Sequence, residues 1–137
     1  GESLEHFHVF RRDRAPDDDL ATLSLHTDVG LFIVMTAPEY FSEPGAERLA
    51  PEAGKPASGF VLQLPSGELV KPVAPEGSLL VLNGEGATRW MRAVDGARRP
   101  RPATHEVTVP DIRGMARAWF GRMYFPPRDA LLQADDA

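Results

Sequence analysis

Residues 23–35 read Leu23-Ser24-Leu25-His26-Thr27-Asp28-Val29-Gly30-Leu31-Phe32-Ile33-Val34-Met35, two short apolar runs that meet at Val29-Gly30. We expect a strand on each side of this turn, over 21–28 and 30–36. Successive side chains of a strand alternate between its two faces, so His26 and Asp28 point to the same side and Leu25 to the other. One strand end therefore offers an imidazole and a carboxylate from one face.

The rest of the chain continues this pattern of short apolar runs. Its 12 glycines and 13 prolines separate the runs, as is typical of a sandwich or barrel. Eight short strands in one domain predict an all-β double-sheet jelly roll with little helix. Further strands are expected at 4–11, 59–64, 68–74, 78–83, 103–109 and 116–125. Turns are expected at 15–19 and at Asp95-Gly96.

The composition limits the class of protein. The chain has 137 residues, enough for one domain, and 42% of them are hydrophobic. Its formal charge of -5 argues against nucleic acid as a partner. The absence of cysteine excludes disulfides, thiolate zinc sites and cysteine nucleophiles. No apolar stretch approaches the roughly 20 residues that a membrane span needs. We expect a soluble protein, with a cytoplasmic location favoured.

A third candidate ligand lies far along the chain, in Ala103-Thr104-His105-Glu106-Val107. Two imidazoles and one carboxylate are the ligand set of the facial triad that holds non-heme Fe(II) and leaves positions open for substrate and O₂. The alternative is structural: Asp28 is a turn residue, and His26 and His105 are hydrogen-bonded strand residues.

Arg117 lies in the last predicted strand, before an aromatic run that ends at Pro126. An arginine that points into a sandwich is a buried charge and needs an anionic partner. Guanidinium groups pair with carboxylates in bidentate fashion. That carboxylate belongs either to a ligand or to an Asp or Glu of the protein.

Six blocks, in order, resemble the 2-oxoglutarate/Fe(II)-dependent dioxygenases, in particular the branch of isopenicillin N synthase and the plant flavonoid and gibberellin oxygenases. The resemblance covers roughly residues 4–126 and implies a double-stranded β-helix (a cupin-like jelly roll). The blocks are His26–Met35 (family HxDxGxLTxL), Gly59-Phe60-Val61-Leu62 (GLQV), Val73–Glu85 (VxPxPGSLVVNxGD), Asp95-Gly96 (Asn-Gly), His105-Glu106-Val107 (HRV) and Arg117 with Pro126 nine residues later (RxSxxxFxxP).

The resemblance also implies roles for single residues. His26, Asp28 and His105 would bind Fe(II), and Arg117 would take the distal carboxylate of 2-oxoglutarate. O₂ would be the other co-substrate, and succinate and CO₂ the co-products.

Two positions depart from the family pattern. Trp119 stands where the family has the Ser of RxS. Arg113 is therefore a second candidate to bind the carboxylate of the co-substrate. The first strand lacks the Tyr that reaches the co-substrate in many members, so His8 or His6 is expected in its place.

The long segment 37–58 is rich in Pro, Ala, Glu and Gly, which predicts an insertion loop. In the layout of the resembled family this loop lies near the barrel mouth. It serves there either as a substrate lid or as a passive loop. Tyr40 and Phe41 are its candidate lid aromatics, and Trp90 is a further candidate for packing on substrate. We expect residues 1–127 to form the oxygenase core and residues 128–137 a C-terminal tail. A missing N-terminal region or a partner is expected to cover one sheet face.

Three functions remain in competition. The first is an Fe(II)- and 2-oxoglutarate-dependent oxygenase that hydroxylates or otherwise oxidises a small organic substrate. The second is a non-catalytic jelly-roll binding module. The third is a cupin-like metal enzyme that does not use 2-oxoglutarate. The three intact ligands favour the first and third over the second, and Arg117 favours the first over the third.

Overall fold

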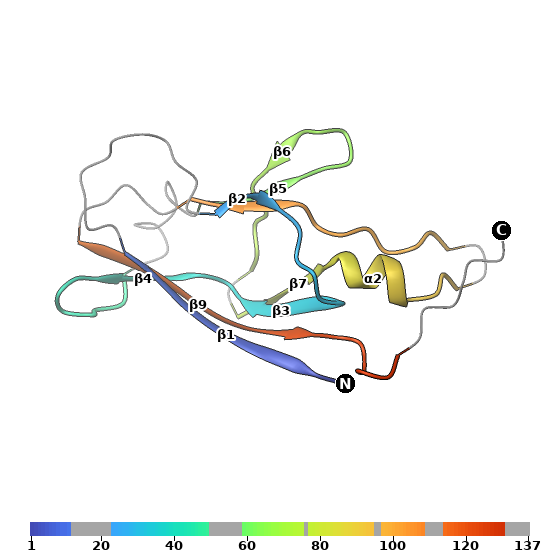
Figure 1. The fold of residues 1–137 in the computed structure, drawn as a ribbon. Coiled ribbons are helices and arrows are strands. Elements are labelled where there is room, and N and C mark those ends of the chain that lie inside the picture. The colour runs from blue at the N-terminus through green and yellow to red at the C-terminus, as the bar shows by residue number, and fades with distance from the viewer. Residues whose placement is uncertain (12–22, 50–58, 76, 95–96, 109–113, 131–137) are drawn as a thin grey trace.

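Two β-sheets form the protein, one above the other (Figure 1). The computed structural model describes residues 1–11, 23–49, 59–75, 77–94, 97–108 and 114–130. The expected turns at 15–19 and 95–96 lie outside these residues, as does Arg113. The elements are β1 (Ser3–Arg11), β2 (Leu23–His26), β3 (Phe32–Thr36), β4 (Glu39–Ser42), β5 (Phe60–Gln63), β6 (Leu69–Val70), β7 (Leu79–Asn83), α2 (Glu85–Trp90), β8 (His105–Val107) and β9 (Met115–Tyr124).

The larger sheet has the order β1-β9-β3-β7, and β4 also pairs with β9. The smaller sheet has the order β2-β8-β5-β6. Every pairing is antiparallel. The chain crosses from one sheet to the other after β1, β2, β4, β6, β7 and β8. Strands that are distant in sequence therefore face one another, which is the expected all-β, double-sheet architecture.

The long central strand β9 organises the larger sheet. It pairs with β1 along one edge, while β3 and β4 share its other edge. From Arg117 onward its side chains alternate: Arg117 and Met123 are buried, while Phe120 and Arg122 are exposed. On the outer face, Arg122 forms an ion pair with Glu5 of β1. The inner face of β9 therefore supplies both core and candidate site residues.

The hydrophobic core lies between the sheets. Phe60 and Val107 come from the smaller sheet and pack against side chains of the larger one. Burying side chains of this size stabilises the fold by about 1.5–3 kcal/mol each. The core residues from the larger sheet are Ile33, Met35, Leu82 and Met123.

Two elements differ from the sequence-based expectation. Residues 39–42 of the expected loop 37–58 form β4, because their backbone pairs with residues 115–118 of β9. Residues 50–58 of that segment lie outside the described residues. The six-residue helix α2 was not expected either. It does not alter the prediction of a mostly β fold with little helix, which is confirmed.

The outer face of the larger sheet carries exposed apolar side chains. Phe7 is 73% exposed, and its cross-strand partner Phe120 is 43% exposed. Leu79 and Val81 of β7 are also exposed. The expectation that another segment or a partner covers a sheet face stays a prediction. Within the described residues, no helix has the length and apolar character of a membrane span.

Candidate metal centre

The structure brings His26, Asp28 and His105 together. His26 ends β2 and His105 begins β8, and the two residues are direct cross-strand partners. Asp28 follows β2 by two residues. Each of the three offers a ligand atom, and these atoms all lie within 4.8 Å of one another. The expected convergence of two distant segments is therefore present in the fold.

Both imidazoles are oriented by their own strands. His26 Nδ1 lies 2.7 Å from the carbonyl oxygen of Ser24, and His105 Nδ1 lies 2.9 Å from that of Ala103. A carbonyl oxygen only accepts hydrogen bonds, so each Nδ1 must carry the proton. In the neutral ring each Nε2 then keeps its lone pair, the form in which histidine binds a metal. The ring centroids are 4.4 Å apart and the planes are tilted by 52°.

Helix α2 fixes the backbone around Asp28. The Asp28 carbonyl accepts a 2.7 Å hydrogen bond from the backbone N–H of Glu85, and the Gly30 carbonyl accepts one of 3.0 Å from Gly86. The Thr27 hydroxyl donates to the Glu85 carboxylate at 2.7 Å. A Cβ at Gly84 would lie 2.3 Å from the Gly30 carbonyl oxygen and 2.7 Å from that of Asp28. This close approach requires glycine and holds the third ligand in place.

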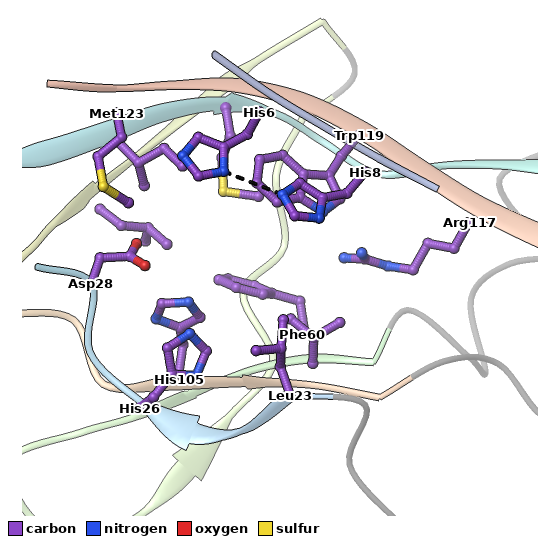
Figure 2. A pocket seen from close by; sticks show the side chains of 14 residues that line it. His6, His8, Leu23, His26, Asp28, Phe60, His105, Arg117, Trp119 and Met123 are labelled. Atoms are coloured by element: carbon purple, nitrogen blue, oxygen red, sulfur yellow. Dashed lines mark hydrogen bonds between the residues drawn. The ribbon is translucent and has the colours of Figure 1, made fainter. Parts of the chain in front are cut away.

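A cavity of about 190 Å³ adjoins the three ligands, between the sheets (Figure 2). Apolar side chains such as Phe60 and Met123 form most of its wall. Figure 2 shows Asp28 on one side of this cavity and Arg117 on the other, with His6, His8 and Trp119 along the larger sheet. The cavity therefore has a candidate metal end and a cationic end.

Arg117 is a buried cation that lacks a matching anion in the described part of the chain. It is 0% exposed, and none of its three guanidinium nitrogens has a hydrogen-bond partner there. Its cross-strand neighbours are Phe10 and Tyr40. The guanidinium carbon lies 5.8 Å from the Phe10 ring centre. Burial lowers the pKa of Arg117, and the nearby Tyr40 hydroxyl opposes that shift. An isolated buried charge is costly, so an anionic partner, from a ligand or from the protein itself, is expected at this site.

Strand β1 contributes two stacked rings, His6 and His8, to the cavity wall. The His8 ring lies 4.7 Å from Trp119, with 8° between their planes, and His6 stacks on His8 at 5.4 Å. His6 Nδ1 and His8 Nε2 are 3.2 Å apart. Burial, and then the neighbouring His6, lower the pKa of His8. Trp119 therefore fills space beside these two histidines, at the position where the resembled family has a small hydroxyl residue.

The remaining candidates lie elsewhere. Tyr40 and Phe41 were expected in a loop, and that placement is wrong, because β4 holds both of them against β9. Neither residue, nor Trp90 at the end of α2, is among the described residues that line the cavity. Contact of any of these three with a substrate stays a prediction.

Sequence reasoning missed the contribution of α2. Its only local signal is Gly84-Glu85-Gly86 directly after a strand. His6 was considered only as an alternative to His8 in place of the family Tyr, and the spacing that puts both on one face did not indicate that the two rings contact each other.

No protein-family model matches the chain, and no characterised protein matches it in sequence. Among solved structures, the crystal structure of a full-length Neurospora crassa protein in complex with alpha-KG matches it with a TM-score of 0.57 and 15% sequence identity. The match covers 88% of this chain and 31% of that chain. The protein thus spans about a third of the length of the Neurospora crassa chain, and the likeness shows that the two share a fold.

Proposed function

We propose that this protein is an Fe(II)- and 2-oxoglutarate-dependent oxygenase that hydroxylates or otherwise oxidises a small organic substrate. The observation that carries the proposal is the pairing of two features in one cavity. One is a cluster of two imidazoles and a carboxylate. The other is the buried guanidinium of Arg117, which has no hydrogen-bond partner among the described residues.

The donor set fits Fe(II). Two neutral imidazoles and one carboxylate from one side of an ion form the facial triad, which leaves positions open for other ligands. His26, Asp28 and His105 would hold the metal. The carbonyl partners of both Nδ1 atoms fix the rings with Nε2 available.

The cationic end fits the co-substrate. Arg117 would bind the distal carboxylate of 2-oxoglutarate with its two-pronged guanidinium, and His8 would donate a further hydrogen bond beside it. The Neurospora crassa protein, which has the same fold, was solved with alpha-KG (2-oxoglutarate) bound, and this supports the choice of co-substrate. With O₂, the bound metal and co-substrate would supply oxidative C–H chemistry that yields succinate and CO₂. The apolar wall would exclude water and position the substrate.

The other two functions fit less well. A non-catalytic binding module gives no reason for three ligand atoms to lie within 4.8 Å with both imidazoles in the metal-binding tautomer. A cupin-like enzyme without an anionic co-substrate would leave the Arg117 charge buried and uncompensated.

We further propose the domain plan that goes with this function. Residues 1–127 form a double-stranded β-helix with eight core strands, to which β4 is an addition, and residues 128–137 form a tail. The six sequence blocks favour the isopenicillin N synthase-like branch of these oxygenases.

Anaerobic spectroscopy tests the proposal. Fe(II) together with 2-oxoglutarate should give a weak visible charge-transfer band with the folded protein. The band should be absent when either component is omitted. The His26→Ala variant should bind Fe(II) poorly and give no band. If folded wild-type protein lacks the band at saturating Fe(II) and 2-oxoglutarate, the proposed function is wrong.

A further inference from the structure

One buried polar atom of the cavity is not used by the proposed function. His6 lines the cavity, and its Nε2 is buried without a hydrogen-bond partner among the described residues. Buried polar atoms are nearly always paired, so an unpaired one beside a cavity points to a partner held in the cavity. The co-substrate would pair with Arg117 and His8, which leaves His6 Nε2 for a second molecule.

The two histidines share one proton between them. His6 Nδ1 and His8 Nε2 face each other at 3.2 Å, so one nitrogen must donate and the other accept. The stacking of both rings along Trp119 holds this geometry. In Figure 2, His8 lies on the Arg117 side of the pair and His6 on the Met123 side. A choice of tautomer at His8 therefore fixes the tautomer at His6.

We propose that His6 recognises the organic substrate through Nε2, and that the co-substrate, through His8, makes this nitrogen a hydrogen-bond acceptor. A carboxylate only accepts, so a His8 beside it donates through Nδ1. A neutral imidazole has one N–H, so His8 Nε2 must then accept from His6 Nδ1–H. His6 Nε2 is left with a lone pair.

The substrate class follows from this order of hydrogen bonds. The preferred substrate is a small, uncharged, largely apolar molecule that carries one O–H or N–H donor. A molecule that offers only a carbonyl or ether oxygen cannot donate a hydrogen bond to His6 Nε2, so it binds weakly. Burial lowers the pKa of His8, which favours its neutral form. The inference rests on the proposed function, because the bound 2-oxoglutarate carboxylate sets the direction of the hydrogen bond between His6 and His8.

Nitrogen NMR of ¹⁵N-histidine-labelled protein tests the order of donors. The protein is loaded with Zn(II), which is diamagnetic and does not react with O₂, and 2-oxoglutarate is added. Protonated and unprotonated imidazole nitrogens have well-separated ¹⁵N shifts. With 2-oxoglutarate bound, we expect Nδ1 to be protonated in both His6 and His8, and Nε2 of His6 to be unprotonated. In His8→Phe, 2-oxoglutarate should leave the tautomer of His6 unchanged.

The two possible failures are distinguishable. Calorimetry on the same Zn(II)-loaded sample reports whether 2-oxoglutarate binds at all. Absence of binding contradicts the proposed function. Binding with His6 Nε2 still protonated overturns only this inference.

A matched panel of small molecules tests the substrate class. Small alcohols and N–H heterocycles, each with its O-methyl or N-methyl derivative, are screened by ligand-observed NMR against the protein loaded with Zn(II) and 2-oxoglutarate. Among the compounds that bind, we expect methylation to weaken binding at least tenfold, and His6→Phe to abolish this difference. The alcohol and heterocycle arms show which donor is preferred. Methyl derivatives that bind wild-type protein as tightly as their parents overturn the inference.

Discussion

Replacement of Arg117 with Met has opposite expected effects with and without 2-oxoglutarate. The side chain is fully buried, and its three nitrogens have no hydrogen-bond partner in the described structure. Truncation of one partner of a buried carboxylate–guanidinium pair costs about 2–5 kcal/mol, in large part because the other charge is left unpaired. We therefore expect Arg117→Met to weaken 2-oxoglutarate binding by about 3 kcal/mol, or roughly 150-fold.

Without 2-oxoglutarate, the same change removes an uncompensated buried charge. A well-packed apolar side chain in that place is expected to be neutral or stabilising. The melting temperature of Arg117→Met should therefore equal or exceed that of the wild type. Arg117→Lys is the matched control, because it keeps the charge but loses the bidentate geometry. Its affinity for 2-oxoglutarate should lie between that of the wild type and that of Arg117→Met.

Anaerobic calorimetry with Fe(II)-loaded protein measures the affinity, and thermal unfolding without ligand measures the stability. Two results would refute the reasoning. Unchanged 2-oxoglutarate affinity would move the carboxylate site away from Arg117, with Arg113 as the next candidate. A fall of the ligand-free melting temperature by about 10 °C or more would mean that an acidic residue of the protein already pairs with Arg117.

Three further predictions concern the support of the site. Gly84→Ala should destabilise the protein by about 1–3 kcal/mol and weaken Fe(II) binding, because the new Cβ would collide with the carbonyls of Gly30 and Asp28. Thermal unfolding and Fe(II) titration check both effects. The control is Gly45→Ala, because a Cβ at Gly45 meets no atom closer than 3.8 Å. Trp119→Ser should lower the melting temperature, through the loss of stacking on His8, yet tighten 2-oxoglutarate binding, because it restores the hydroxyl of the family pattern. Calorimetry measures the affinity, and an unchanged value would contradict this prediction. Because burial lowers the pKa of folded His8, its protonation favours the unfolded chain, so stability should fall as the pH drops below the unfolded value of about 6.5. His8→Phe should flatten that part of the stability–pH profile measured by denaturant unfolding, and an identical profile would contradict the assigned cause.

The sequence predicted those features that local spacing determines. The alternation of side chains predicted His26 and Asp28 on one side, and the two do come together, although β2 ends at His26 and Asp28 lies beyond it. The apolar runs located the strands that carry His105 and Arg117. The resemblance to a family supplied the pairing of these distant segments, and the structure brings the three candidate ligands within reach of one ion.

Features that depend on long-range contacts were not predictable in this way. Residues 39–42 form a strand because the edge of β9 beyond β3 is open to them, whereas the composition of the whole segment 37–58 predicts a loop. The short helix α2 is stabilised by contacts with the loop at Asp28 more than by its own sequence, which contains a glycine in the first turn. The lack of a partner for His6 Nε2 among the described residues depends on which groups surround it, so no sequence pattern could reveal it.

The central claim is that two histidines and one aspartate, distant in the chain, bind a single ferrous ion. X-ray absorption spectroscopy of protein loaded anaerobically with one equivalent of Fe(II) tests it most directly, because scattering from imidazole rings reports how many histidines are ligands. We expect two imidazoles on the iron in the wild type and one in His105→Ala. A wild-type spectrum with no imidazole, or a His105→Ala spectrum identical to that of the wild type, would contradict it.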